Sequence, residues 1–181
     1  MEFEEKTVQR TEIYQGPIFK VVQDQVELPE GKGQAQRDLI FHNGAVAVIA
    51  ITPENKMILV KQYRKAIEAT SYEIPAGKLE VGENADPHAA ALRELEEETG
   101  YTGGNWEEIM TIAPNPGVMD NLCHCFYARG VKKTNNQHLD ETEDIDVFLC
   151  PKEEVKQMLL RGEFIQALMV APLWKYFSIK D

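Results

Sequence analysis

The feature that most constrains the fold is a short, sharply bounded helix predicted over residues 87–99. Asp86 is a favoured N-cap residue, proline suits the first helical position, and Gly100 suits the position just past the C-terminus. At about 100° per residue, three glutamates share one arc of this helix, apart from its apolar side. They are Glu94, Glu97 and Glu98. Such a helix needs a core on one side and gathers three carboxylates on the other.

Three like charges on one helical face repel each other, and a purely structural, solvated acidic face is one interpretation. Two observations favour a cation site instead. Glu94 and Glu98 lie one helical turn apart, which suits a shared hard cation. The preceding loop adds Glu80 and Glu83, and the turn at residues 75–77 offers backbone carbonyls. Oxygen ligands favour Mg²⁺ or Mn²⁺, whereas zinc prefers His and Cys.

Length and composition place the chain among ordinary soluble proteins. Its 181 residues suit one domain that buries a core without disulfides. The three cysteines, Cys123, Cys125 and Cys150, are too sparse for a disulfide framework, so we expect buried free thiols. With 30 acidic and 19 basic residues the net charge is -11, which argues against nucleic acid bound through a basic surface.

The chain's start and its apolar segments favour a cytoplasmic protein. The first ten residues are charged and lack the apolar stretch of a signal peptide. No apolar run approaches the ~20 residues that a membrane span needs. We therefore expect no membrane partner.

Hydrophobic periodicity predicts an α+β protein, with a mixed or antiparallel sheet and helices packed on its faces. Strands are expected at residues 18–28, 37–41, 44–52, 57–63, 71–74, 106–112, 122–131 and 145–149, and helices at 87–99, 152–161 and 166–178. The segments 44–52 and 57–63 are expected to form a hairpin, and residues 75–77 a break between strands.

Residues 77–101 resemble the Nudix box, which is Gly, five residues, Glu, seven residues, then Arg-Glu-(apolar)-x-Glu-Glu-x-Gly-(apolar). The matching positions are Gly77, Glu83, Arg93, Glu94, Leu95, Glu97, Glu98, Gly100 and Tyr101. So many simultaneous matches make the motif specific. Nine residues rather than seven separate Glu83 from Arg93. We place the two extra residues at positions 84 and 85, which leaves the helical face intact and the role of Glu83 open.

The resemblance implies a Nudix α/β/α sandwich with a mixed sheet. It also implies Mg²⁺-dependent hydrolysis, with Mn²⁺ as an alternative, of a nucleoside diphosphate linked to another group. The carboxylates of Glu94 and Glu98 and the carbonyl of Ala76 would hold the metal. Glu97 would be a further ligand or would bridge to Arg93, which would orient the glutamates.

Further resemblance points to the branch that holds ADP-ribose pyrophosphatases and nucleoside diphosphate sugar hydrolases. It rests on YEIPAGKLEVGE (residues 72–83), on LDETEDIDVF (139–148) and on Pro116, sixteen residues past Gly100. The branch implies a small nucleotide substrate that is cleaved to a nucleoside monophosphate and a sugar phosphate. In such enzymes a loop glutamate acts as the base on water, and Glu141 is the candidate here, with Glu143 an extra metal ligand. The alternative for both is a flexible acidic turn.

The same branch implies substrate contacts from two arginines. Arg37 and Arg64 resemble positions that bind the diphosphate or terminal ribose, although surface salt bridges are the alternative. Tyr14, Phe19 and Phe41 are candidates for stacking on a base or for core packing.

Residues 1–43 resemble an N-terminal β extension that exchanges strands between subunits, which leaves residues 44–181 as the Nudix domain and implies a homodimer. An exposed edge strand would otherwise need protection. Two other functions remain open. One is Nudix hydrolysis of dinucleoside polyphosphates, nucleoside triphosphates or capped RNA ends. The other is a non-catalytic module that senses a nucleotide.

Overall fold

The computed structural model describes residues 3–180, which divide into two compact units. The first unit combines the residues up to Gly44 with residues 113–122. The second unit holds residues 45–112 and the chain from Cys123 onward. The segment 113–122, which contains Pro116, therefore lies with the N-terminal strands.

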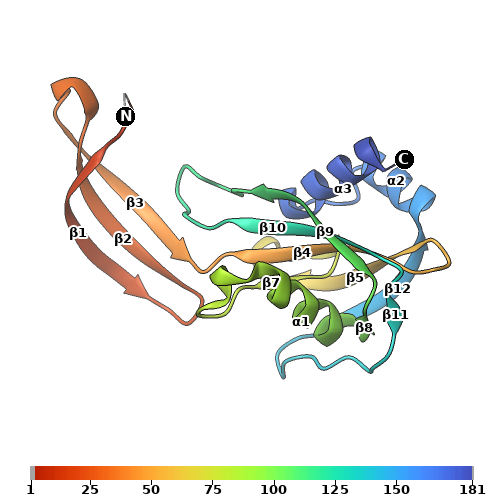
Figure 1. Cartoon of the computed structure of the whole chain (residues 1–181). Helices are drawn as coiled ribbons and strands as arrows, with labels where there is room; N and C mark the ends of the chain where they lie inside the picture. The colour runs from red at the N-terminus through yellow and green to blue at the C-terminus, as the bar shows by residue number, and fades with distance from the viewer. Residues whose placement is uncertain (1–2, 181) are drawn as a thin grey trace. The chain divides into compact units, whose positions relative to one another are not determined.

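The first unit is a three-stranded antiparallel sheet in the order β1-β2-β3 (Figure 1). Its strands are β1 (Lys6–Gln15), β2 (Phe19–Glu27) and β3 (Gln34–His42), with a single 3-10 turn at η1 (Pro29–Gly31). The predictions at 18–28 and 37–41 match β2 and β3. Strand β1 was not predicted, because all ten of its residues are exposed and no buried alternation marks it.

A buried acid holds β1 onto β2. Asp24 is 1% exposed, and both of its carboxylate oxygens accept hydrogen bonds of 2.7 Å from Arg10 on β1. Thr7 Oγ1 donates a further bond of 3.1 Å. Because Arg10 hydrogen-bonds this carboxylate, the pKa of Asp24 is lowered. Burying the charge is tolerable since it is paired and hydrogen-bonded.

The second unit is built on a mixed seven-stranded sheet. Five strands follow the order β12-β5-β4-β10-β9, while β6 pairs with β5 and β7 with β4. Strand β10 is parallel to β4 and the other pairs are antiparallel. The strands are β4 (Ala45–Ile51), β5 (Lys56–Arg64), β6 (Ala69–Glu73), β7 (Ala76–Lys78), β9 (Asn105–Ile112), β10 (Cys123–Arg129) and β12 (Ile145–Pro151). A separate pair joins β8 (Tyr101–Thr102) to β11 (Lys132–Lys133), and η2 (Lys65–Ile67) is a 3-10 turn.

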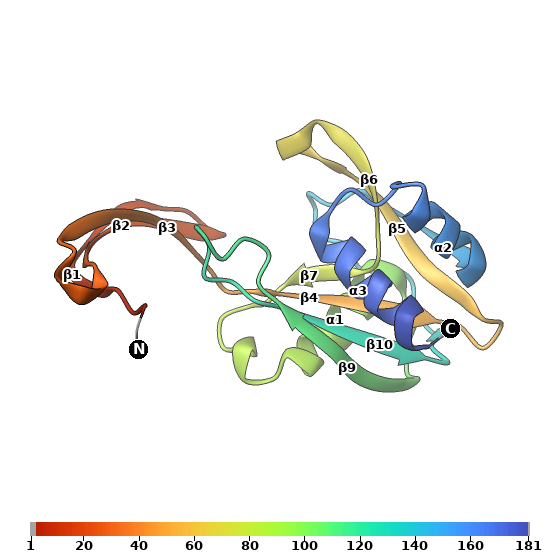
Figure 2. The same cartoon turned by 90° about the horizontal axis from the view of Figure 1, so that it is seen from above.

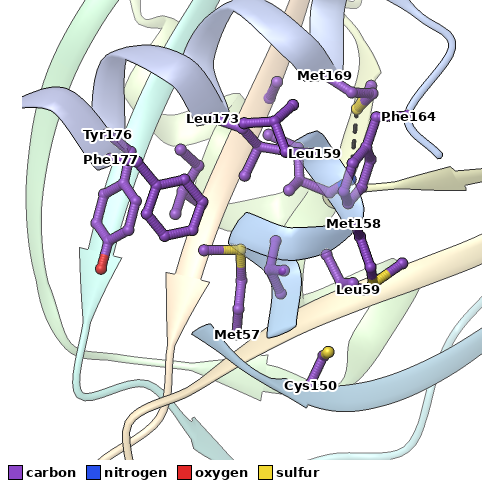
Figure 3. Packing of buried hydrophobic residues seen from close by; sticks show 14 of the residues in the cluster. Met57, Leu59, Cys150, Met158, Leu159, Phe164, Met169, Leu173, Tyr176 and Phe177 are labelled. Atoms are coloured by element: carbon purple, nitrogen blue, oxygen red, sulfur yellow. Dashed lines mark hydrogen bonds between the residues drawn. The ribbon is translucent and has the colours of Figure 1, made fainter. Parts of the chain in front are cut away.

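Helices cover both faces of this sheet, which confirms the α/β/α sandwich (Figure 2). They are α1 (Pro87–Thr99), α2 (Lys152–Leu160) and α3 (Ala167–Ile179). Strand β4 is buried on both sides, so its side chains alternate between two apolar clusters. Ile49 packs with residues of α2 and α3, whereas Val48 packs with residues of α1. Figure 3 shows the first cluster, in which Leu159 and Leu173 lie above Met57 and Leu59 of β5.

Two local predictions need correction. Residues 75–77 are not a simple break, because Ala76–Lys78 forms β7 and pairs with β4. The hairpin of β4 and β5 exists only next to its turn, at the pair Ile51 and Met57. Farther along, β7 takes the place beside β4 and β6 the place beside β5. The sequence pattern did not reveal this because a three-residue strand carries too little periodicity.

The prediction of buried free thiols is confirmed. Cys123, Cys125 and Cys150 are free and buried. Among the described residues, no helix is long and apolar enough to cross a membrane.

The end of α1 supplies a test of this architecture. Gly100 has a φ of +73°, and an added Cβ would lie 2.2 Å from the carbonyl oxygen of Asn135. Gly103 has the same φ but open space around it. We expect Gly103→Ala to cost about 1 to 2 kcal/mol through left-handed strain alone. Gly100→Ala should cost at least about 1 kcal/mol more, through the added clash. Urea denaturation of the two variants measures the difference, and equal losses would contradict the close packing at Gly100.

Candidate functional site

Helix α1 begins and ends as the sequence predicts. Asp86 Oδ1 accepts a hydrogen bond of 3.1 Å from the amide of Ala89, and Gly100 adopts the left-handed conformation after Thr99. The side facing the sheet buries Ala90, Ala91 and Leu95. The carboxylate-bearing side therefore has a fixed direction, toward β7 and the loop that precedes the helix.

The two extra residues of the Nudix-box spacing lie in a 3-10 turn, η3 (Glu83–Ala85). Despite them, Glu83 still reaches the helix, because its two oxygens accept bonds of 3.1 and 3.0 Å from the guanidinium of Arg93. The amide of Glu80 donates a further bond of 2.7 Å to Glu83. The hydrogen bonds from Arg93 lower the pKa of Glu83. The insertion is thus absorbed before the helix without loss of this contact.

Arg93 gathers three glutamates. Besides Glu83 it pairs with Glu94 at 2.9 Å and with Glu97 at 2.7 Å. The predicted pairing of Arg93 with Glu97 is therefore present. Hydrogen bonding to Glu83 is the main cause that raises the pKa of Arg93. Arg93 orients its neighbours by bidentate and shared contacts rather than by a single bond.

On α1, Glu98 is buried and Glu94 is half-buried. Glu98 is 4% exposed, and its Oε2 accepts a hydrogen bond of 3.0 Å from the amide of Ala76 on β7. Burial is the main cause that raises the pKa of Glu98 to about 8 and that of Glu94 to about 7. Glu97 is more exposed, with 42% of its side chain accessible. Of the three helical glutamates, Glu98 is buried and binds β7, while Glu94 and the more exposed Glu97 both pair with Arg93.

Gly77 of β7 lies against the carboxylate of Glu94 on α1. A Cβ at this position would lie 2.0 Å from Cδ of Glu94, so a side chain here would displace that carboxylate. The amide of Ala76 meanwhile binds Glu98. Two successive residues of β7 therefore contact the carboxylates of Glu98 and Glu94, and the glycine at the start of the motif leaves Glu94 in this position.

The donor set around Glu94 and Glu98 fits a hard divalent cation. Across residues 3–180, no three His, Cys, Asp or Glu side chains are already grouped as a complete metal site. Mg²⁺ does not need such a group, because it keeps several waters and uses one or two carboxylates. A cation here would neutralise the carboxylates of Glu98 and Glu94, whose pKa values are raised mainly by desolvation. The metal-binding roles of Glu94, Glu98, Glu143 and the Ala76 carbonyl remain predictions.

The loop before β12 carries the other predicted acids. Glu141 and Glu143 are both exposed. Glu143 closes a turn, since its amide donates to the carbonyl of Asp140 at 2.9 Å and its carboxylate accepts from the amide of Asp140 at 3.2 Å. The negative charge of Glu143 helps to raise the pKa of both Glu94 and Glu98. The charge of Glu143 therefore acts on both Glu94 and Glu98. The roles of Glu141 as a base and of Glu143 as a metal ligand remain predictions.

Arg64 lies in a network that the sequence analysis missed. Its guanidinium donates to both oxygens of Glu73, at 2.7 and 2.5 Å, and Glu73 is fully buried. Gln166, which precedes α3, donates to Glu73 and to Ser71 Oγ. Hydrogen bonding to Glu73 is the main cause that raises the pKa of Arg64, and the charges of Glu98 and Glu143 also contribute. The sequence offered no local signal for Glu73, because its strand, ATSYE, is mostly polar.

Arg37 and Pro116 belong to the first unit, whereas Glu94 and Glu98 belong to the second. Arg37 pairs with Glu5 through bonds of 2.6 and 3.0 Å, and Pro116 is exposed. The salt-bridge alternatives for Arg37 and Arg64 are thus both present in the structure. The predicted substrate-binding roles of Arg37, Arg64 and Pro116 remain untested.

The three candidate aromatic residues differ in surroundings, all within the first unit. Tyr14 and Phe19 are exposed, with ring centroids 5.7 Å apart. Phe41 lies between two cations, with Arg10 at 4.7 Å and Lys20 at 5.1 Å from its ring centroid. Cation–π contacts of this kind hold Phe41 in place.

The pKa shifts of Glu94 and Glu98 predict how the stability of the fold depends on pH. The pKa values of Glu94 and Glu98 are raised above the ordinary value of 4.5, to about 7 and about 8. Between pH 4.5 and about pH 8 the folded protein holds more protons than the unfolded chain. The free energy of unfolding therefore falls as pH rises through this range. One such group contributes at most about 1.4 kcal/mol per pH unit. In EDTA we expect urea denaturation to show a smaller fall for Glu98→Gln than for the unaltered chain, and equal slopes would contradict this.

Comparisons with known proteins agree with this geometry. A family model described as NUDIX domain matches residues 41–171, and one described as nucleoside diphosphate sugar hydrolase N-terminal domain matches residues 5–40. A crystal structure of an ADP compounds hydrolase superposes with a TM-score of 0.80 and 19% identity, covering 97% of this chain and 93% of that one. At that identity the likeness shows the fold alone.

Three relatives align over most of their length. A methanol dehydrogenase activator from Bacillus methanolicus is 48% identical, covering 87% of this chain and 84% of its own. An ADP-ribose pyrophosphatase from Bacillus subtilis is 40% identical over 98% and 95%, and one from Mycobacterium tuberculosis is 30% identical over 92% and 80%. The resemblance carried by the sequence is confirmed: the chain belongs to the Nudix family.

Proposed function

We propose that the chain is a pyrophosphohydrolase of nucleoside diphosphate sugars, of the ADP-ribose or GDP-mannose type. The observation that carries this is the pair of carboxylates, buried Glu98 and half-buried Glu94, which α1 presents to β7 on the helical part of the Nudix box. The two ADP-ribose pyrophosphatases above support it, as does a GDP-mannose pyrophosphatase from Escherichia coli that is 29% identical over 67% of this chain. The products are a nucleoside monophosphate and a sugar phosphate.

The proposed reaction divides among residues of α1 and the acidic loop. Glu94, Glu98, Glu143 and the carbonyl of Ala76 would hold Mg²⁺ or Mn²⁺. When bound, such an ion neutralises the phosphate oxygens and lowers the pKa of water. Glu141 accepts the proton of the attacking water while the bridging P–O bond breaks and its electron pair passes to the leaving phosphate. Arg93 keeps Glu83, Glu94 and Glu97 oriented through its three contacts.

Arginine contacts would supply the substrate's anchor. We propose that Arg64, which Glu73 holds by two bonds, binds the diphosphate, because a guanidinium fixed at one edge still has free donors. Arg64 is 39% exposed at its side chain, so those donors remain accessible. Arg37 and Pro116 would contact the sugar side of the substrate.

We further propose a homodimer formed through residues 1–43. Within the described residues, β1 pairs along one edge only, and it exposes Val8, Ile13 and Tyr14. An exposed edge strand of ten residues otherwise invites uncontrolled pairing. A sedimentation mass equal to that of a single chain would overturn this proposal.

The activity is tested on purified protein with Mg²⁺ and a panel of ADP-ribose, GDP-mannose, UDP-glucose, a diadenosine polyphosphate and a nucleoside triphosphate. We expect a diphosphate sugar to be cleaved to its monophosphate products, read by chromatography. Glu98→Gln should reduce the rate by more than roughly 100-fold, since even partners of metal ligands contribute 10- to 100-fold.

Glu96→Gln is the matched control, because Glu96 lies on the same helix but binds Asn135 instead of β7. Its rate should stay close to that of the unaltered chain. Cleavage of the triphosphate or polyphosphate alone would replace the proposed substrate class. No cleavage of any compound would favour a nucleotide-sensing module.

A second candidate function is activation of an alcohol dehydrogenase. The observation that favours it is the 48% identity to the methanol dehydrogenase activator. We expect the purified chain to raise the turnover of a methanol dehydrogenase, and Glu98→Gln to lose this effect if activation depends on hydrolysis. An unchanged dehydrogenase rate excludes this candidate.

A further inference from the structure

The C-terminus of α1 is completed by the segment that follows β11. A helix leaves its last carbonyls without partners inside the helix. Here the carbonyl of Gly100 accepts from the amides of Thr134 and Asn135, at 3.0 and 3.1 Å. The carbonyl of Glu97 accepts from the amide of His138 at 2.8 Å. These bonds come from the backbone, so they do not depend on the identity of the side chains.

One further bond in this region does depend on a side chain. Gln137 Nε2 donates to the carbonyl of Glu98 at 2.8 Å and also to the carbonyl of Ile145 at 3.1 Å. Glu98 is the buried acid of α1, and Ile145 is the first residue of β12. A single amide group therefore joins the backbone of the acidic helix to the backbone of the edge strand.

The acidic loop, residues 138–144, follows Gln137 and ends at Ile145, the first residue of β12. Its first residue, His138, binds the carbonyl of Glu97 on α1 through its backbone amide, and the loop carries Glu141 and Glu143. Both ends of this loop are thus held at one point beside Glu98. Since Glu141 and Glu143 are exposed, packing contributes little to their placement. The fixed ends, together with the turn that Glu143 closes on Asp140, restrict the loop.

We propose that Gln137 is a positioning residue that fixes the acidic loop relative to the carboxylates of α1. This rests on the proposed function, in which Glu141 accepts the proton of water and α1 holds the metal. Loss of the amide would leave α1 and the substrate contacts in place but free the loop. The effect should fall on kcat, because misplacement of a reacting group by about 1 Å can cost roughly 100-fold.

The test compares three variants of the full-length chain. Gln137→Met has nearly the same length but no donor, and we expect kcat for the diphosphate sugar to fall roughly 10- to 100-fold with little change in KM. Gln137→Lys, whose ammonium can donate to two carbonyls, should recover most of that loss. Asn135→Ala is the matched control, since it removes a side-chain bond to Glu96 without touching Ile145, and its kcat should be unchanged.

A second measurement does not require activity. Amide hydrogen exchange of residues 138–144 should be faster in Gln137→Met than in the unaltered chain, while exchange in α1 up to Leu95 stays the same. A folded Gln137→Met with unaltered kcat, or with unaltered exchange in the loop, overturns the proposal. If the unaltered chain cleaves no diphosphate sugar, the proposed function fails, and the exchange experiment still decides whether Gln137 orders the loop.

Discussion

The close contact of β7 with α1 is the constraint on which the site depends. Ala76 donates its amide to Glu98, and Gly77 leaves room for Glu94 by lacking a Cβ. A buried carboxylate is costly unless it is paired, hydrogen-bonded or bound to a metal. The fold supplies Glu98 with one backbone hydrogen bond and Glu94 with one contact to Arg93. The apolar clusters on both faces of the sheet stabilise an arrangement that these two acids alone would oppose.

The sequence predicts this helix well because its signals are local. The N-cap Asp86, the glycine after Thr99 and the apolar stripe that includes Leu95 all agree on one element. The continuous apolar run of β4 likewise predicts a buried strand. Strand β1 was missed because its exposed residues carry no such run, and its position depends on pairing with β2. Strand β7 was missed because its three residues are defined by β4 and α1 rather than by their own pattern.

The part of the site that the sequence predicted is the part with local signals. Contacts within one helix, such as Arg93 with Glu97, follow from the spacing of four residues. The contact of Glu83 with Arg93 could not be judged from an altered spacing, since it depends on how η3 folds the extra residues away. Glu73 and Gln137 act between elements distant in sequence, and no local pattern marks them. Long-range contacts of this kind need the fold before they can be recognised.

The acids of the site differ in the property that their proposed roles require. Glu98 is buried and Glu94 half-buried on a rigid helix, where a fixed geometry favours holding a cation. Glu141 is exposed on a loop, where water can reach it. An exposed loop loses precision unless its ends are held. Gln137 precedes this loop, and its side-chain amide binds the carbonyl of Glu98 on α1 and that of Ile145, where the loop ends. The carbonyl of Glu98, in the last turn of α1, therefore also helps to hold the loop through Gln137. This single backbone group links the carboxylates of α1 to Glu141.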